Sequence, residues 1–531
     1  MSQRPRIVFI GICAAARDLI VEGARRGELP TFARLFERGL SGRTRSVEGL
    51  YSQCTWPAFY TGTGPAKQGV HSWEQLREGT YEFYRAHTPD HVRTPPFWHF
   101  LSRAGRRVAV FDVPHSPLTS DINGIQTVEW GAHDYNHGFG AVPAALADEI
   151  VARFGRHPQD VLCDADRTPQ EIAAFRDRLL AGIEGKAAIT RHYLAQEDWD
   201  FFAQVFTESH CVGHQCWHLH DRSHPRFSEA DAAVAGDPMN DVYVAIDRAI
   251  GDILAGVDAR TTVIVMACHG MNAKYSAQFM LGDILLKLGL AARRAPPGGA
   301  GLVATKRGLD PVLTWAWQQV PAFAQSWLQP LRHGARDWVS SVPRSDLPAK
   351  LDPAASRCFV IANNATHGGI RVNLAGREPA GIVQPGAECE ALLARLEREL
   401  LALVNAETGR RIVVRTMRTR ALYDSDVTGH FPDLLVEWAS ADPVVAVQSP
   451  SFDRLDKADV YCRTGDHNAG GFFVATGPGI APGRLDRVVS VMDFAPTFCA
   501  ALDAPAGGFD GAPIAELVAA VRAHAAAETA A

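Results

Sequence analysis

Short apolar runs rich in valine, isoleucine and phenylalanine alternate along the chain with segments of helical composition. Runs of this length and content are typical of buried strands. Their alternation with helical segments predicts an α/β fold in which helices flank a sheet. The predicted strands are Ile7–Ile12, Arg107–Val113, Phe201–Thr207, Thr262–Ala267, Arg411–Thr416, Asp433–Trp438 and Gly471–Ala475.

Several of these runs end in residues that can bind a ligand. Cys13 follows the first run, Asp112 lies at the end of the second, Glu208 follows the third, and Cys268 with His269 follows the fourth. Open α/β sheets bind ligands at the carboxyl ends of their strands. The recurrence therefore predicts one shared site at that edge of the sheet.

The segment 287–355 departs from this rhythm. It contains Pro-Pro-Gly-Gly, four tryptophans and many helix formers, but no clear strand. We interpret it as an inserted helical cap over the site; the alternative is a peripheral helical subdomain that touches no substrate. The core then consists of residues 1–286 and 356–520, and the alanine-rich residues 521–531 are expected to form a frayed tail.

Composition indicates an ordinary globular protein. The 531 residues are 47% hydrophobic and 21% charged, which suffices for a large core. A net charge of −6 gives no electrostatic basis for binding nucleic acid. The apolar run Ile7–Ile12 is too short for a signal-peptide core or a membrane span, so we expect a cytoplasmic location and no membrane partner. Ten cysteines without a CxxC pair indicate neither a disulfide framework nor a zinc ribbon.

The most informative local stretch runs from Tyr51 to Pro65. It places Thr55 directly before Trp-Pro, where a helix is predicted to begin. A hydroxyl there faces free backbone N–H groups and the positive end of a helix dipole, which favours an alkoxide and an anionic substrate. Thr55 is therefore a candidate nucleophile; the alternative is a plain N-cap. The adjacent Cys54 is a second candidate nucleophile or ligand, or a buried residue behind the helix start.

Four segments carry residues that can bind a metal ion. If the chain turns helical after Phe201–Thr207, His210 and His214 are four residues apart on one face, and both imidazoles can reach one ion. Each segment alone is a weak signal, but together with Thr55 they indicate a metal-dependent enzyme. The four segments are Cys13, Glu208–His214, Met266–Met271 and Thr464–Gly471.

Further short motifs occur in a definite order along the chain. They are Asp18-Leu-Ile, Leu29–Leu35, Thr55-Trp-Pro, Thr61–Val70, Arg107–Pro114, Val212-Gly-His, His269-Gly-Met, Gly369–Leu374, Gly376–Pro379, Pro432-Asp-Leu, Gly465-Asp-His and Ala475–Ile480. In content and order these motifs resemble the alkaline phosphatase superfamily, most closely its type I phosphodiesterase and nucleotide pyrophosphatase branch. The resemblance covers nearly the whole chain outside the cap.

The resemblance implies an alkaline phosphatase-like α/β sandwich with a mostly parallel central sheet. It also implies two divalent metal ions, usually zinc, beside a threonine or serine nucleophile, and Thr55 lies at the nucleophile position. The implied ligands of one ion are Cys13, Thr55, Cys268 and His269, and those of the other are His210, His214 and His467.

This chain departs from its relatives at three of these positions. The resemblance implies aspartate where the chain has Cys13, His210 and Cys268. A decayed site is expected to carry Ala, Ser, Asn or Gly, whereas each of these replacements can itself bind a metal. Cysteine and histidine suit Zn, Cu, Fe or Ni. We therefore expect re-specified metal chemistry, with zinc as the first choice and copper or iron as alternatives.

The replacements also predict two unequal sites. Two thiolates and one imidazole donate much charge, so an ion bound by Cys13, Cys268 and His269 is a poorer Lewis acid. Three neutral imidazoles leave an ion more electrophilic, with room for water. The hypothesis is that the histidine-bound ion activates water or substrate, while the cysteine-bound ion has a structural, anchoring or redox part.

Three functions remain open at this point. The leading one is a hydrolase of a phosphodiester, phosphomonoester or related ester of a small molecule, in which Thr55 attacks in line. The second is a metal–thiolate redox or lyase-type enzyme on the same scaffold, and the third is a non-catalytic metal-binding or structural protein. Lys67 is the one conspicuous cation near Thr55, and His115, His133 and His367 are in loops that could line the pocket.

Overall fold

The computed structural model describes most of the chain outside one long internal segment. The expected cap falls largely on residues 294–350, which lie outside the described residues together with its four tryptophans, and so does His133. The described residues are 6–50, 54–86, 88–131, 136, 138–158, 165, 167–275, 277–293, 351–361, 363, 366–423, 429–457 and 463–530.

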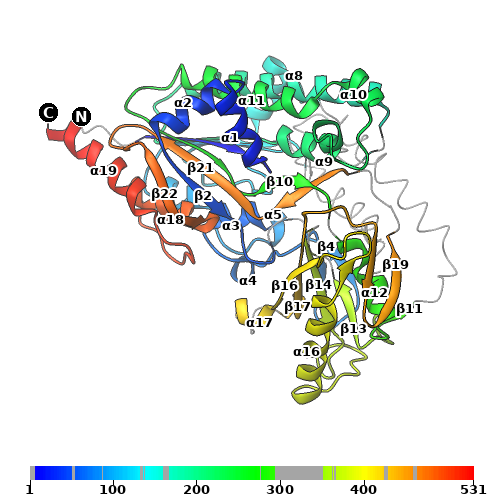
Figure 1. The fold of residues 1–531 in the computed structure, drawn as a ribbon. Coiled ribbons are helices and arrows are strands. Elements are labelled where there is room, and N and C mark those ends of the chain that lie inside the picture. The colour runs from blue at the N-terminus through cyan, green and yellow to red at the C-terminus, as the bar shows by residue number, and fades with distance from the viewer. Residues whose placement is uncertain are drawn as a thin grey trace.

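A nine-stranded sheet forms the centre of the molecule (Figure 1). Every residue of β1, β8 and β9 is buried, as expected for apolar runs that are covered on both faces. In spatial order the strands are β22 (Gly483–Ser490), β2 (Leu40–Arg45), β21 (Gly470–Thr476), β9 (Thr262–Ala267), β1 (Ile7–Ile12), β8 (Phe201–Phe206), β5 (Val108–Phe111), β6 (Gly124–Val128) and β7 (Gly140–Val142).

The middle of this sheet is parallel, and that arrangement gathers the strand ends. Strand β1 pairs in parallel with β8 on one side and β9 on the other, and β8 pairs in parallel with β5. Gly11 of β1 lies opposite Val205 of β8 and Met266 of β9. The residues that follow these strands therefore lie side by side at the carboxyl edge.

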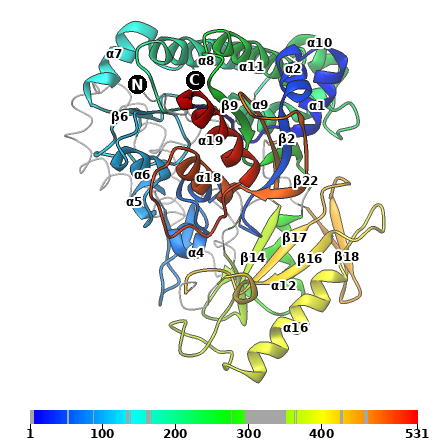
Figure 2. The ribbon, with the colours of Figure 1, turned by 90° about the vertical axis from the view of Figure 1, so that its left-hand side faces the viewer.

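Helices cover both faces of the central sheet (Figures 1 and 2). One layer consists of α1 (Arg17–Arg26), α2 (Pro30–Arg38), α7 (Ala145–Phe154), α8 (Pro169–Leu194), α9 (Glu208–His220), α10 (Glu229–Ala235) and α11 (Pro238–Leu254). The other consists of α3 (Thr55–Thr61), α6 (Phe97–Arg103), α18 (Phe494–Ala501) and α19 (Ala515–Ala530). Short helices α4 (Pro65–Gln68) and α5 (Thr88–His91) and the 3-10 turns Gln278–Met280 and Val491–Asp493 connect these elements.

A second hydrophobic cluster defines what we call the small lobe, built mainly from residues 277–293 and 351–457. Its four-stranded antiparallel sheet packs against α12 (Leu281–Lys287) and α16 (Ala387–Leu401) (Figure 2). That sheet contains β13 (Cys358–Ile361), β14 (His367–Val372), β17 (Leu434–Trp438) and β16 (Val413–Arg418), followed by helix α17 (Thr419–Leu422). Smaller pairings are β15 (Val404–Asn405) with β18 (Ala446–Ser449) and β19 (Phe452–Asp456), β11 (Ala292–Arg293) with β12 (Leu351–Asp352), β3 (Glu74–Leu76) with β4 (Phe83–Arg85), and β10 (Gly270–Ala273) with β20 (Gly465–Asn468).

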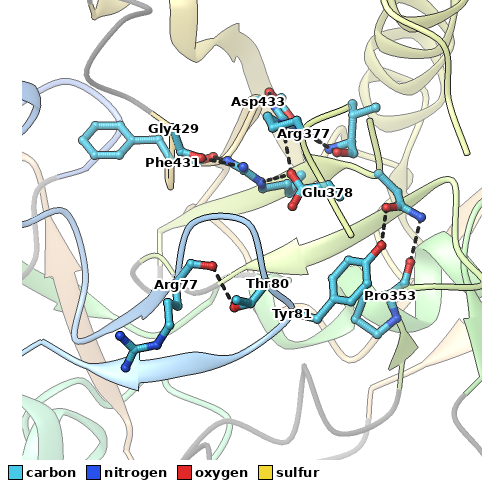
Figure 3. Close-up of polar contacts among 12 residues, drawn as sticks. Arg77, Thr80, Tyr81, Pro353, Arg377, Glu378, Gly429, Phe431 and Asp433 are labelled. Atoms are coloured by element: carbon cyan, nitrogen blue, oxygen red, sulfur yellow. Dashed lines mark hydrogen bonds and ion pairs between the residues drawn. The ribbon is translucent and has the colours of Figure 1, made fainter. Parts of the chain in front are cut away.

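Buried and half-buried ion pairs stabilise the small lobe (Figure 3). The fully buried Arg371 donates to Glu378 at 2.7 Å and to the carbonyl of Phe431 at 2.6 Å. Arg377 joins the same Glu378 at 2.8 Å and pairs with both oxygens of Asp433 at 2.6 and 2.7 Å. These ion pairs connect β14 to the chain around Asp433. They give a structural role to the motifs Gly369–Leu374 and Gly376–Pro379.

The structure differs from the sequence-based expectations in two C-terminal regions. The predicted strands at 411–416 and 433–438 form, but they belong to the antiparallel sheet of the small lobe and not to the central sheet. Residues 521–531, expected to be a frayed tail, continue α19 as far as Ala530. In the described part of the chain, no helix has both the length and the apolar content needed to cross a membrane.

Candidate active site

Unusual backbone conformations gather at the carboxyl edge of the central sheet. Four non-glycine residues there have left-handed backbones: Ala14 (φ 51°) after β1, Asp112 (φ 52°) and His115 (φ 60°) after β5, and Glu129 (φ 61°) after β6. Such conformations cost free energy and persist where the surrounding structure holds them, as at functional sites. Their position agrees with the predicted location of the site.

Helix α9 carries two of the predicted ligands toward this edge. It begins directly after β8, and His210 and His214 are one turn apart and buried, with 3% and 0% exposure. Ser209 donates a hydrogen bond of 2.6 Å to the carbonyl of Cys13, which fixes the start of the helix against the end of β1. The predicted helical spacing of the histidine pair is therefore present.

The third histidine comes from a distant part of the sequence. His467 lies on β20, opposite Met271 of β10. The backbone of Gly465 approaches α9 so closely that a Cβ atom there would be 2.1 Å from the carbonyl oxygen of Gly213. Only glycine allows this approach, which brings His467 up to the face of α9.

The three imidazoles converge through their Nε2 atoms. Nε2 of His214 is 3.2 Å from Nε2 of His210 and 3.1 Å from Nε2 of His467, and the ligand atoms of the group all lie within 4.8 Å of one another. In the described part of the chain, no other group of three or more His, Cys, Asp or Glu residues gathers in this way. We call His210, His214 and His467 the histidine set.

The geometry of the histidine set fits a metal ion. Two imidazole nitrogens bound to one tetrahedral zinc ion are roughly 3.3 Å apart, given Zn–N bonds of about 2.0–2.1 Å. Nδ1 of His214 lies 2.8 Å from the carbonyl oxygen of Gly465, so it carries the proton and leaves Nε2 with a lone pair. The observed Nε2 separations and this tautomer are those that a shared ion requires.

The other predicted ligands are close by but arranged differently. Cys13 and Cys268 follow β1 and β9 in matching register, and His269 comes next; all three are buried. The indole N–H of Trp56 lies 3.3 Å from Sγ of Cys13. The His269 ring lies 4.7 Å, centroid to centroid, from that of His467, so the two groups are neighbours. We call Cys13, Cys268 and His269 the cysteine set; it does not converge as the histidine set does.

Burial raises the pKa of two thiols near the site. Burial, and then the neighbouring Cys13, raise the pKa of the Cys268 thiol well above its usual value. Burial also raises the pKa of Cys54 well above its usual value. Because a thiolate is the reactive form, this argues against Cys54 as a nucleophile.

Thr55 lies at the first position of α3 rather than before it. The N-cap position is taken by Cys54, and no side chain caps this helix, so the alternative that Thr55 is a plain N-cap does not hold. The Thr55 hydroxyl is fully buried and lies 2.6 Å from the hydroxyl of Ser46, at the end of β2. This short contact fixes the orientation of the Thr55 oxygen.

Some residues expected near the site have other partners. Lys67 pairs with Asp510 at 3.0 Å near the surface. His367 lies on β14 in the small lobe, 3.8 Å from Glu437, and lowers the pKa of that carboxyl group to about 2, together with Arg415. His115 follows β5 at the carboxyl edge, where its carbonyl accepts a hydrogen bond from Tyr60 of α3 at 2.9 Å.

Arg463 is a site residue that the sequence alone did not reveal. One of its guanidinium nitrogens lies 3.2 Å from Nε2 of His214, and the side chain is partly buried. It precedes the predicted segment Thr464–Gly471 by one residue, but the chain contains many arginines and nothing in its local sequence marks this one. Ser46 escaped notice for the same reason.

A buried charged network supports the start of α9. Lys186 of α8 is fully buried and lies 3.2 Å from Glu208, the first residue of α9, and 4.0 Å from Asp112. His157 contacts the same oxygen of Glu208 at 3.1 Å. Lys186 also donates to Thr207 at 2.8 Å. The network therefore joins the ends of β5 and β8 to the helix that carries His210 and His214.

Comparisons with known proteins identify the family and support the fold. A family model described as type I phosphodiesterase / nucleotide pyrophosphatase matches residues 8–314, more than half of the chain. The solved structure of phosphonoacetate hydrolase from Sinorhizobium meliloti 1021, in complex with phosphonoformate, has a TM-score of 0.50 at 14% identity and covers 95% of this chain and 97% of that chain. Murine ectonucleotide pyrophosphatase/phosphodiesterase 5 has a TM-score of 0.47 at 11% identity, covering 96% and 98%. The comparison with curated proteins found no match. The structural likeness supports the alkaline phosphatase-like fold.

Proposed function

The chain belongs to the type I phosphodiesterase / nucleotide pyrophosphatase family, and from that premise we propose that its candidate active site is a metal-dependent one with Thr55 as the nucleophile. Membership makes the protein a phosphoric ester hydrolase. The proposed substrate is a phosphodiester, phosphomonoester or related ester of a small molecule. The metal use and the role of Thr55 are the parts that need an experiment.

The convergence of the histidine set is the observation that carries the proposal. Three buried imidazoles from α9 and β20 point their Nε2 atoms at one another across 3.1–3.2 Å. Nε2 atoms at this spacing can share one divalent ion, and an ion there would replace the contact between Nε2 of His214 and the Arg463 guanidinium group. His210, His214 and His467 would hold a divalent ion, which would supply Lewis-acid chemistry when bound. We expect zinc, with copper or iron as alternatives.

Thr55 and Ser46 supply the nucleophile and its orientation. The 2.6 Å contact between their hydroxyls holds the Thr55 oxygen in one direction at the start of α3. A hydroxyl that is held in place loses less entropy on reaching the substrate, which accelerates attack. Ser46 acts as a positioning residue.

Arg463 supplies the fixed positive charge that Lys67 does not. Its guanidinium group lies beside the histidine set, whereas Lys67 is held by Asp510. Guanidinium groups bind phosphoryl oxygens with two parallel hydrogen bonds and remain charged at every accessible pH. We assign Arg463 to the binding of the non-bridging oxygens of the substrate.

The cysteine set, with Thr55, is the proposed second site. Its members lie at adjacent strand ends, and thiolate ligands suit zinc, copper or iron. An ion there would require Cys13 to give up its contact with the Trp56 indole. We therefore assign the catalytic part to the histidine set and a structural or anchoring part to the cysteine set.

Hydrolysis of an aryl phosphodiester by zinc-loaded protein tests the proposal. We expect Thr55→Ala to lower kcat by about a thousandfold or more while bound metal at the histidine set is retained, because the nucleophile is lost and the imidazoles are not. Thr55→Ser keeps a hydroxyl and should retain much of the activity. Equal activity of Thr55→Ala and the unaltered protein would exclude Thr55 as the nucleophile.

A further inference from the structure

A groove of about 370 Å³ lies at the β22 side of the central sheet, away from the histidine set. Residues of α1 and α2 line one side of it, and residues of β2, β21 and β22 line the other. The two helices lie beside these strands in the ribbon (Figures 1 and 2). Four arginines line it: Arg17 and Arg25 from α1, Arg43 from β2 and Arg484 from β22. We call this cavity the arginine groove.

The arginine groove has an unbalanced positive charge. Among the residues that the structure describes, no aspartate or glutamate lines it. Arg43 and Arg484 are exposed, and neither has a hydrogen-bond or ion-pair partner for its guanidinium group among the described residues. Arg17 pairs only with Asp18, whose side chain is 93% exposed, and Arg25 lies 3.9 Å from Glu22. Exposed pairs of this kind contribute little free energy, so Arg17 and Arg25 can exchange these partners for a bound anion at low cost.

The charge contrasts with the rest of the protein. The chain as a whole has a net charge of −6, so four guanidinium groups around one small volume are a local reversal of sign. Clefts lined by one sign of charge attract ligands of the other sign. Guanidinium groups match phosphate oxygens in shape as well as charge.

The walls add an apolar surface between the arginines. Val21, Ala24, Ala33 and Phe36 are half-buried and face the groove. The Phe36 ring packs 6.0 Å, centroid to centroid, from the buried Phe472. The volume falls in the range of small-molecule sites, about 300–1,000 Å³. The groove therefore suits a ligand with both an anionic part and a compact apolar or aromatic body.

We propose that the arginine groove is a second binding site, for a phosphate-bearing small molecule of the nucleoside diphosphate class. The phosphates would lie among Arg17, Arg43 and Arg484, and the ring would lie against Phe36. Arg43 precedes Ser46 by three residues, so the groove is about 10 Å along β2 from the partner of Thr55. The inference rests on the charge and shape of the arginine groove and is independent of the proposed hydrolase activity.

Binding of a non-hydrolysable probe tests the inference on the full-length, metal-loaded protein. A fluorescent α,β-methylene-ADP measures affinity by anisotropy, and an azido derivative of the same nucleotide marks the site after illumination and peptide mapping. We expect labelled peptides within residues 17–43 or 472–484. Arg43→Gln and Arg484→Gln should each weaken binding at the groove by about tenfold, since each removes a charged hydrogen bond.

The matched control is Arg103→Gln, which removes an exposed arginine of α6 outside the groove. It should leave affinity and labelling unchanged, and all three variants should keep the unfolding temperature and aryl ester hydrolysis of the parent. Labelling confined to peptides that carry Thr55, His210–His214 or His467 would overturn the proposal, because the nucleotide would then bind only at the active site. So would absence of saturable binding, or an equal loss in Arg103→Gln.

Discussion

The histidine set and the cysteine set lie at the same edge of the same sheet, and both consist of buried residues that can bind a metal. In the histidine set, the Nε2 atoms are 3.1–3.2 Å apart, close to the separation that a shared ion requires. In the cysteine set, the residues follow neighbouring strands, and Sγ of Cys13 is engaged by Trp56. Burial and a shared location thus do not by themselves make a metal site.

The difference follows from the elements that carry each set. Cys13 and Cys268 come from the ends of two neighbouring strands of one sheet, and the indole N–H of Trp56 already contacts Sγ of Cys13. The histidine set instead combines two residues on one face of α9 with one residue of β20. The close approach at Gly465 brings β20 against α9.

The largest expected effect comes from breaking the histidine set. His214→Ala should remove the metal ion bound there and lower kcat/KM by about a thousandfold or more, because the Lewis acid is lost. Metal content by elemental analysis and hydrolysis of an aryl phosphodiester measure both. His220→Ala, on the same helix but paired with Asp237, is the control and should retain metal and activity. Full metal content in His214→Ala would contradict the assignment.

The second largest expected effect comes from removing Lys186, the cation of the buried network at the start of α9. Lys186→Met leaves Glu208 and Asp112 buried without their cation and should lower the free energy of unfolding by about 3–5 kcal/mol. Urea unfolding measures the loss. Arg191→Met, on the exposed side of the same helix, should change the free energy by about 0.5 kcal/mol or less. A similar small change in Lys186→Met would mean that the network does not hold α9.

One further histidine pair, the buried His71 and the half-buried His430, tests what burial alone does to an imidazole. His71 and His430 have ring centroids 5.2 Å apart, and burial, with Arg371 and Arg93, lowers the pKa of His430 to about 4. The unfolded chain binds this proton near pH 6.5, so stability should fall as the pH drops from about 6.5 to 4, by about 2 kcal/mol for this group.

Thermal unfolding of chelator-treated protein between pH 7 and pH 4.5 measures that loss. His430→Gln, which cannot take up the proton, should show a shallower pH dependence than the parent. Zinc should raise the unfolding temperature of both proteins equally, since the histidine set is intact in each. An unchanged pH slope in His430→Gln would show that the acid sensitivity originates elsewhere.

The smallest expected effect comes from the cysteine set. Cys268→Ala should retain the ion held by the histidine set and lower hydrolysis by less than about tenfold, because the proposed catalytic ion keeps its three ligands. If the cysteine set binds a second ion, total metal per chain should fall by one equivalent. Loss of all bound metal in Cys268→Ala would mean that the cysteine set, and not the histidine set, is the primary metal site. An unchanged metal content would mean that the cysteine set binds no ion.

Much of the central fold could be predicted from the sequence. The apolar runs at β1 and β9 coincide with the predicted strands, because a strand buried on both faces has to be apolar throughout. The pair His210 and His214 could also be predicted, since a spacing of four residues acts locally on one helix. The small lobe was not anticipated, because its strands read like those of the central sheet and only pairing assigns them.

Other parts of the site depend on contacts between distant segments. Ser46 reaches Thr55 because β2 ends beside α3, and Arg463 reaches His214 because β20 packs on α9. Neither residue type is rare enough to stand out in the sequence. Similarly, the register of β1 and β9 sets the spacing of Cys13 and Cys268, and no local pattern encodes that distance.

X-ray absorption at the zinc edge, on protein loaded with one equivalent of zinc, compares the two sets most directly. If the histidine set holds the ion, the nearest shell should contain only nitrogen or oxygen, at about 2.0–2.1 Å. A sulfur shell at about 2.3 Å would mean that Cys13 or Cys268 binds the ion first, and would contradict the central claim that the histidine set is the primary metal site.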